Sequence, residues 1–372
     1  MTGKTTTTWA NTSLSARLGI EYPIIQGPLG GLSSQRLTAA VSNFGGLGSF
    51  GAHGLIPSAI NDIIAQIRSL TSKPFAMNLW VSMEDEGAFS SDEVAFTKAL
   101  ASISGLIEEL GGSLPAYKPY APVRFVDQAR VLLDAKVPVF SFIYGIPPKE
   151  ILDEFRANGS VIVGTATTPD EAVALEQAGV DVIVASGFEA GGHRGSFLRP
   201  SEESLTGTFS LVPQVADLVD VPIVAAGGIA DARGVVAALA LGADGVQMGT
   251  AFLACEESGA HKLHRAALLD GKAGDTALTR GFTGRLGRGI KNELLEKLNQ
   301  PSAPFLPYPL QRFLMRSLSG AAEKAGRPEL FPMWAGQSAN LARHTDATTL
   351  LQSLVADVSG IADAVVRWNA AR

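Results

Sequence analysis

The sequence predicts an α/β fold, a (β/α)₈ TIM barrel with a smaller helical cap, from three observations. Eight short apolar runs rich in β-branched residues recur along the chain, patterns typical of helices separate them, and Gly or Pro bounds most of the runs. The 372 residues can form one large core and a smaller second unit. Eight βα units favour a closed barrel, and an open doubly wound sheet is the alternative.

The predicted strands are short and apolar enough to be buried on both faces of a parallel sheet. They cover residues 23–26, 46–50, 75–81, 137–142, 161–165, 180–186, 222–226 and 245–248. Helix boundaries support the alternation. Pro169 begins a helix that ends at Gly179, and Asp231 is predicted to cap the N-terminus of a helix that ends at Gly242.

Two segments extend beyond a minimal barrel, which we predict to occupy residues 14–255. Residues 84–123 are too long for a simple loop, contain a helical pattern at 91–110, and are predicted to form an excursion over the barrel mouth. Beyond this barrel the pattern is mainly helical. We expect a cap or substrate domain at 256–344, and C-terminal helices at 345–372 that pack back on the barrel.

Composition excludes several functional classes. The formal net charge of −6 argues against a nucleic-acid-binding surface, which needs a basic face. Cys255 is the single cysteine, so no internal disulfide can form and a reducing compartment fits. The start of the chain, 1–13, is polar, and no apolar run approaches the roughly 20 residues of a membrane span. We therefore expect a cytoplasmic protein without a nucleic-acid or membrane partner.

Glycine-rich turns follow the last two predicted strands. Gly227 and Gly228 come after residues 222–226, and Gly249 and Thr250 come after residues 245–248. Glycine lets backbone N–H groups approach a phosphate, and the start of the next helix adds a partial positive charge. Because barrels often bind phosphate after strands 7 and 8, these turns predict a phosphate site. The alternative is that the glycines only make tight turns.

His193 lies in a glycine-rich loop, 187–195, directly after the predicted strand at 180–186. Imidazole titrates near neutrality, so a histidine at the mouth of a barrel is suited to accept a proton from a weak acid. The alternative is a histidine that only hydrogen-bonds the loop. The neighbouring Glu189 and Arg194 are expected to shift its pKa in opposite directions.

The other four histidines give weaker signals. His261 and His264 are three residues apart on a predicted helix, but no third ligand accompanies them, so we expect a solvated face and predict no metal site. His53 and His344 have no supporting context. Aromatic candidates for a substrate pocket are Tyr144, Phe197 and Tyr308, although core packing explains each almost as well.

Together, four segments resemble one family. EAGGHRG after VDVIVASGF, AAGGIAD, GVQMGTAF and PIIQGPLGG are similar to the nitronate monooxygenase family, once called 2-nitropropane dioxygenases. The resemblance implies non-covalent FMN at the C-terminal face of the barrel and a small helical domain over the flavin. It also implies oxidation of an alkyl nitronate, or of a nitroalkane, by O₂ to a carbonyl compound and nitrite.

Carried over by position, the resemblance makes His193 the catalytic base. The FMN-binding residues would be Pro28, Leu29, Asn78, Ser186, Gly191, Gly192, Gly227, Gly228, Gln247, Met248, Gly249 and Thr250. Two of these depart from the family pattern. Ser186 stands where many members have a glutamine, and Leu29 replaces a frequent methionine, so we expect altered flavin contacts.

Three other readings stay open from the sequence. One is an NAD(P)H-dependent FMN quinone or enoyl-thioester reductase on the same scaffold. A second is a phosphate-binding regulatory barrel without turnover, and a third is a metal-dependent hydrolase or lyase. The sequence also leaves the oligomeric state open, with a homodimer as one alternative.

Overall fold

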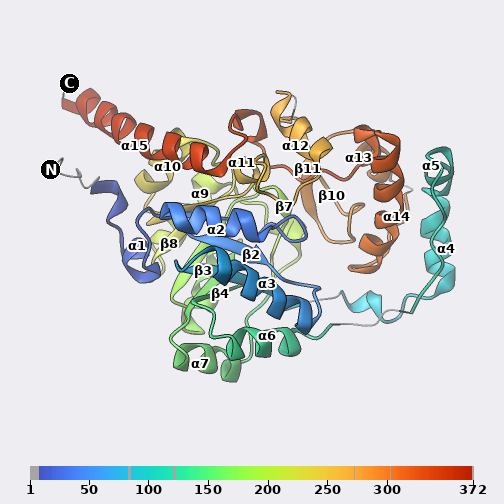
Figure 1. The fold of residues 1–372 in the computed structure, drawn as a ribbon, viewed down its shortest axis with the longest axis horizontal. Helices are drawn as coiled ribbons and strands as arrows, with labels where there is room; N and C mark the ends of the chain where they lie inside the picture. Colours follow the sequence, from blue (N-terminus) through green and yellow to red (C-terminus); the bar gives the residue numbers. More distant parts are fainter. Residues whose placement is uncertain (1–7, 83–84, 120–122, 272, 302, 371–372) are drawn as a thin grey trace.

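Eight parallel strands form the centre of the computed structural model, which describes residues 8–82, 85–119, 123–271, 273–301 and 303–370 (Figure 1). The strand order is β1-β9-β8-β6-β5-β4-β3-β2. Gln26 N donates to Leu47 O, and Leu47 N donates to Ile24 O, so β1 also meets the chain just before β2. The sheet therefore closes on itself, and the predicted (β/α)₈ barrel is confirmed. Residues 1–7 of the predicted polar start, and 83–84 and 120–122 of the predicted excursion, lie outside the described residues.

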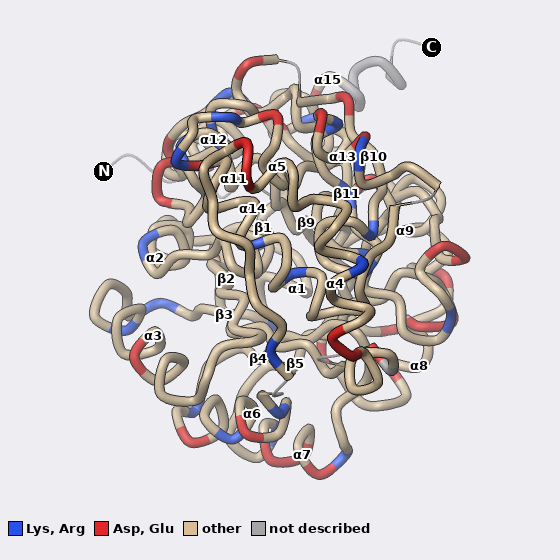
Figure 2. The backbone as a smooth tube through the Cα atoms, turned by 90° about the vertical axis from the view of Figure 1, so that its right-hand side faces the viewer, with Lys and Arg blue, Asp and Glu red and all other residues tan. Residues whose placement is uncertain are grey.

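Each of the eight predicted strands is present, within about two residues of its predicted ends. The barrel strands are β1 (Ile24–Gln26), β2 (Gly48–Gly51), β3 (Phe75–Trp80), β4 (Val139–Ile143), β5 (Val161–Ala166), β6 (Val182–Ser186), β8 (Ile223–Ala226) and β9 (Gly245–Met248). None of them contains a charged residue, whereas Lys, Arg, Asp and Glu intermingle on outer helices such as α6 and α7 (Figure 2). Both faces of the strands can therefore be covered by apolar side chains.

Helices surround the barrel and pack on its outer face. They are α2 (Gln35–Phe44), α3 (Pro57–Leu70), α6 (Phe125–Asp134), α7 (Lys149–Ala157), α8 (Pro169–Gln177), α9 (Thr208–Ala216), α10 (Ala232–Ala240) and α11 (Thr250–Leu253). The predicted boundaries of α8 and α10 are confirmed to within two residues. Thr168 caps α8 with Pro169 in its first turn, and Asp231 caps α10 by accepting from Arg233 N and Gly234 N.

The first and last described segments of the chain lie on the same side of the barrel (Figure 1). After η1 (Thr8–Ala10), α1 (Ser13–Leu18) leads into β1, and α15 (Ala347–Ala370) packs against α10 and α2. Leu350, Leu351 and Leu354 of α15 are buried in the barrel's core. Among the described helices, none combines the length and the apolar character needed to cross a membrane.

The cap has its own apolar core beside the barrel. Its helical elements are η2 (Glu86–Ala88), α4 (Glu93–Ala101), α5 (Ser104–Glu109), α12 (Lys262–Leu269), α13 (Glu293–Leu298), α14 (Leu310–Ala325), η4 (Pro328–Leu330) and η5 (Ala339–Leu341). Helices α4 and α5, which come from the predicted excursion, lie on the side of α14 that faces away from the barrel (Figure 1). Ile103 and Ile107 bury their side chains there with Leu314 and Leu318 of α14.

A small antiparallel sheet joins the cap to the barrel. Its strands are β10 (Thr276–Thr279), β11 (Gly287–Ile290) and β7 (Gly192–His193), in the order β10-β11-β7. The pattern did not predict β10 and β11, because four residues with two glycines in β11 give almost no strand signal. Gly287 pairs with His193, so the loop after β6 is held directly by a strand of the cap.

Candidate functional site

A cavity opens at the carboxyl ends of the barrel strands, where the cap meets the barrel. It encloses about 1260 Å³, counting the part that is open to solvent. Its lining includes His193 and all but one of the residues predicted to bind the cofactor, namely Pro28, Leu29, Asn78, Ser186, Gly191, Gly192, Gly227, Gly228, Gln247, Gly249 and Thr250. Met248 is the exception, because its side chain is fully buried and its carbonyl accepts from Gly27 N.

One end of the cavity is lined by backbone rather than by side chains. Gly227 and Gly228 have φ values of 105° and 72°, which favour glycine. A Cβ on Gly227 would also lie 2.9 Å from Gly187 O. Two hydroxyls border this end, since Ser338 Oγ donates to Gly228 O and Thr250 Oγ1 accepts from Gly336 N at 2.9 Å. An open glycine floor beside hydroxyls and the start of α11 fits a phosphate group.

The cap and the His193 loop touch backbone to backbone at Gly191. A Cβ on Gly191 would lie 2.5 Å from both Ala335 C and Gly336 N. Gln337 N donates to Glu189 O at 2.9 Å, which fixes the same contact. The segment around Trp334 therefore forms one wall of the cavity together with the loop.

Polar side chains line the middle of the cavity at the ends of the strands. Asn78 Nδ2 donates to Ser141 Oγ at 3.0 Å, an arrangement that fixes the direction of the amide. Ser186 ends β6, and Gln247 lies on β9 next to the glycine turn. Such a row of hydrogen-bonding groups fits the edge of a flat heterocycle.

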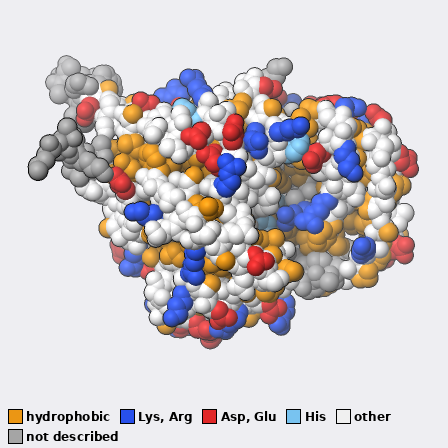
Figure 3. All heavy atoms as spheres, in the orientation of Figure 1, with side chains coloured by type: hydrophobic (Ala, Val, Ile, Leu, Met, Phe, Trp, Pro, Cys, Tyr) orange, Lys and Arg blue, Asp and Glu red, His pale blue; other side chains and the backbone are white. Residues whose placement is uncertain are grey.

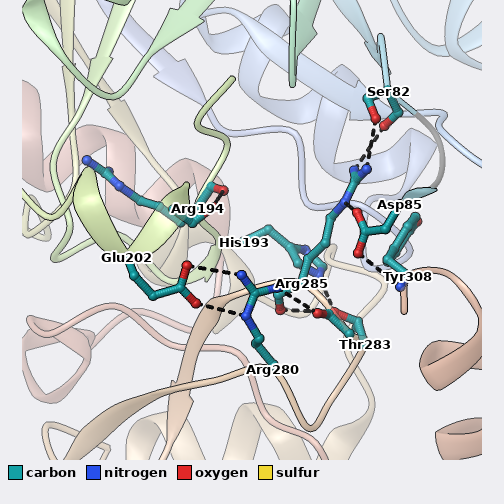
Figure 4. Close-up of polar contacts among 11 residues, drawn as sticks. Ser82, Asp85, His193, Arg194, Glu202, Arg280, Thr283, Arg285 and Tyr308 are labelled. Carbon is teal, nitrogen blue, oxygen red and sulfur yellow. Dashed lines mark hydrogen bonds and ion pairs between the residues drawn. The ribbon is translucent and has the colours of Figure 1, made fainter. Parts of the chain in front are cut away.

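His193 is half-buried and lines the same cavity. Figure 4 shows its hydrogen bond to Thr283. Its Nε2 lies 2.7 Å from Thr283 Oγ1. In the tautomer in which Nε2–H donates to the Thr283 hydroxyl, that hydroxyl can donate to Arg285 O, 3.4 Å away, and the imidazole lone pair lies on Nδ1. The alternative that His193 only hydrogen-bonds its own loop does not hold, because its partner belongs to the cap.

Aromatic rings surround His193. Its ring centroid lies 5.0 Å from that of Trp80 and 4.8 Å from that of Trp334, and both tryptophans line the cavity. Tyr308 stands 6.1 Å from His193. These rings make an apolar chamber around the imidazole.

The three aromatic residues named from the sequence do not themselves line this cavity. Tyr144 and Tyr308 are buried against Trp80, with ring centroids 4.8 and 5.1 Å from it. Phe197 packs against the barrel core, and its N–H donates to Glu171 Oε1 at 2.6 Å. Sequence reasoning missed Trp80, although its place at the end of a predicted strand was a usable signal.

Arg285 is a buried cation next to His193 (Figure 4). It donates from Nε to Asp85 Oδ1 at 2.8 Å, and from Nη1 and Nη2 to the carbonyl and hydroxyl of Ser82 at 2.9 Å. The guanidinium carbon also lies 4.2 Å from the ring centroid of Tyr144 and 4.7 Å from that of Tyr308. These contacts hold the positive charge in one place.

Burial, and then the positive charges of Arg285 and Arg312, lower the pKa of His193 to about 3. The imidazole is therefore neutral at cellular pH. Lys or Arg and His side chains gather in the hollow between the barrel and the cap, consistent with a positive field there (Figure 3).

The expected influence of Glu189 and Arg194 on His193 was wrong. Glu189 accepts from Thr208 N at 2.9 Å, and Arg194 donates to backbone carbonyls, including that of Thr167 at 3.0 Å. Both side chains are thus used to hold the loop, while the charges that act on His193 come from the cap.

Two other histidines also differ from expectation. His53 is buried, stacks on Trp80 at 3.8 Å and lines the cavity. Its Nε2 lies 3.5 Å from Arg312 Nη1, and burial lowers its pKa well below the usual value. His264 does not lie on a solvated face, because it is buried with Nε2 2.8 Å from Trp334 O. Both therefore support the aromatic walls of the cavity in neutral form.

Comparisons with known proteins agree over nearly the whole chain. A sequence model of the nitronate monooxygenase family matches residues 11–357. A probable nitronate monooxygenase from Staphylococcus aureus (strain Newman) is 40% identical over 358 residues, which cover 95% of this chain and 99% of the relative. Among solved structures, the nitroalkane oxidase from Streptomyces ansochromogenes has a TM-score of 0.85 at 37% identity, over 95% of this chain and 99% of that one. FabK from Thermotoga maritima has a TM-score of 0.74 at 28% identity, over 96% and 99%.

Proposed function

The chain belongs to the nitronate monooxygenase family and is a flavin-dependent oxidoreductase, and we propose that it oxidises alkyl nitronates with O₂ to a carbonyl compound and nitrite. One observation carries this proposal. A single cavity is lined both by a glycine floor that fits a phosphate and by a neutral histidine among aromatic rings. A small anion with an alkyl group can thus be held between the histidine and a flavin.

We propose FMN as the flavin. Gly228, Gly249 and Thr250 would hold its phosphate, since their turns meet at one end of the cavity and leave space free of side chains. Asn78 and Gln247 would bind the edge of the ring system. When bound, FMN supplies the one-electron chemistry that connects oxidation of the nitronate to reduction of O₂.

His193 is the proposed proton acceptor when a neutral nitroalkane enters. The C–H bond next to the nitro group breaks, the proton goes to the imidazole lone pair, and the electron pair stays on the substrate as a nitronate. Trp80 and Trp334 exclude water around this step, and the imidazole must be neutral to accept the proton.

The first test is the visible spectrum of the purified protein, followed by anaerobic mixing with ethylnitronate and, separately, with NADH. We expect a yellow protein whose flavin absorbance changes with the nitronate and not with NADH. Rapid bleaching by NADH alone would move the assignment to an NAD(P)H-dependent quinone or enoyl-thioester reductase. That alternative is the second candidate because FabK shares this fold. A colourless protein that cannot be loaded with FMN contradicts both.

Gly191→Ala is expected to lower flavin occupancy at least about tenfold and to cost about 1–3 kcal/mol of stability. The added methyl would lie 2.5 Å from Ala335 C and Gly336 N, so backbone rather than a flexible side chain must move. Gly191 lies outside the left-handed region, hence the effect is steric. The flavin-to-protein ratio after gel filtration measures the loss of flavin, and the Tm measures the loss of stability.

Gly105→Ala is the matched control, because a methyl there has no heavy atom within 4 Å. If Gly191→Ala binds as much flavin as this control, the close contact between loop and cap does not position the flavin site.

A further inference from the structure

His193 has a neutral hydrogen-bonding partner where many catalytic histidines have a carboxylate. Thr283 Oγ1 lies 2.7 Å from its Nε2. Figure 4 labels two carboxylates, and both are used elsewhere: Asp85 accepts from Arg285 Nε at 2.8 Å and from Tyr308 N at 3.1 Å, and Glu202 accepts from Arg280 Nε at 2.8 Å. In the part of the chain that the structure describes, no Asp or Glu forms an ion pair with His193.

The charged groups around His193 disfavour a proton on its ring, and the neutral titratable groups around it do not stabilise one. Arg285 and Arg312 are cations. His53 and Tyr308 are held neutral, since burial lowers the pKa of His53 and raises the pKa of Tyr308. Trp80 and Trp334 contribute apolar rings only. An imidazolium here would therefore be only partly solvated and would have no anion as a hydrogen-bonding partner.

The chemistry of the hydrogen-bonding partner determines how stable the protonated form of the imidazole is. A carboxylate orients a histidine and also stabilises the imidazolium that forms when it takes a proton. A threonine hydroxyl orients the ring equally well but carries no charge. His193 is thus placed for contact with substrate while its protonated form stays costly.

We propose that Thr283 is the residue that restricts this site to substrates that are already ionised, so that nitronates are oxidised in preference to the corresponding neutral nitroalkanes. This inference rests on the proposed function. A neutral nitroalkane must first give its proton to His193, which creates a third positive charge beside Arg285 and Arg312. A nitronate needs no such step, and its negative charge is attracted by the same two guanidinium groups.

The position of the Thr283 hydroxyl is set by the backbone, which makes it a clean site for substitution. Thr283 is 5% exposed, and its N–H donates to Arg280 O. Gly284 follows with φ of 96°, where a Cβ would lie 2.5 Å from Tyr308 N. A side chain of similar size at 283 therefore projects to the same place next to His193 Nε2.

The test compares Thr283→Asp with the isosteric Thr283→Asn, each assayed with nitroethane and with ethylnitronate, the neutral and ionised forms of one compound. Thr283→Asp places a carboxylate on Nε2–H and is expected to raise the pKa of His193 by about 1–3. The expected consequence is a rise of at least about tenfold in the ratio of kcat/KM for nitroethane to that for ethylnitronate. Thr283→Asn adds no charge and should not raise this ratio.

Ring titration of labelled histidines by NMR gives a readout that does not depend on turnover. His193 is assigned by the resonance that disappears in His193→Asn. We expect its pKa to rise in Thr283→Asp and not in Thr283→Asn, with the flavin spectrum and circular dichroism confirming that both variants fold. Thr283→Ser retains a hydroxyl and should keep the wild-type preference for ethylnitronate.

Three outcomes overturn the inference: equal kcat/KM of the wild type for both compounds, an equal gain in Thr283→Asn, or a raised pKa of His193 in Thr283→Asp without a change in preference. A different result separates this inference from the proposed function. If the flavin-loaded wild type oxidises neither compound, the proposed function fails and this inference falls with it, whereas a lost preference alone overturns only the role of Thr283.

Discussion

His193→Asn is expected to lower kcat/KM for a neutral nitroalkane by about 10²–10⁴-fold, the usual contribution of a positioned base. The value for the corresponding nitronate should fall much less, because the ionised substrate has no proton to lose. Asparagine keeps a hydrogen-bonding group near Thr283 but has no basic nitrogen. Steady-state oxygen uptake with nitroethane and ethylnitronate measures the split.

His261→Asn is the control for this substitution. His261 lies outside the cavity and caps α12 through Nδ1, a role that asparagine also performs well. If His193→Asn reduces kcat/KM for both compounds equally, His193 binds the substrate without serving as the proton acceptor.

His193→Asn should also unfold at lower pH than the wild type. The pKa of His193 is about 3 in the folded protein, below the usual value of about 6.5 in an unfolded chain. Its contribution to stability is therefore fully present above about pH 6.5 and is lost as the pH falls toward 3, since the unfolded chain binds the proton first. Asparagine does not titrate, so acid unfolding followed by circular dichroism should shift to lower pH.

Arg285→Met is expected to lower the free energy of unfolding by about 2–3 kcal/mol. The substitution removes three charge-assisted hydrogen bonds to Asp85 and Ser82, and leaves the Asp85 carboxylate without its cation. Because Arg285 also lowers the pKa of His193, that pKa should rise, although burial keeps it below the usual value. Urea unfolding and histidine titration measure the two effects.

Arg280→Met provides a matched comparison within the same turn. Arg280 also pairs with a carboxylate, that of Glu202 at 2.8 Å, but its side chain is 34% exposed, against 7% for Arg285. Its loss should cost no more than about 1 kcal/mol. Equal losses in the two variants would show that the buried arrangement of Arg285 adds no stability beyond a surface ion pair.

The barrel could be predicted from the sequence because its signals are local. Each strand is a short uncharged run, and the glycine turns after β8 and β9 lie directly beside the strands that position them. The same holds for His193, which follows β6 within one loop. Patterns of a few residues were enough to bring these groups to one face of the fold.

The partners of His193 could not be predicted because they are distant in sequence. Thr283 and Arg285 reach it through the pairing of β7 with β11, two very short strands about 90 residues apart. Tyr144 was expected near the substrate, but its ring is buried against Trp80, with the two ring centroids 4.8 Å apart, and does not line the cavity. His264 was expected on the surface, but the helix begins beside His261 and places His264 on its buried face.

The register in which Gly287 pairs with His193 has a consequence for engineering. The central residue of the site is part of a sheet whose other strands belong to the cap, so barrel and cap are not interchangeable modules. A chimaera that takes its cap from a relative would have to inherit residues 192–193 and 287–290 from the same parent. Recombination between relatives should therefore keep the strands of the small sheet together, rather than exchange everything after β9, the last barrel strand.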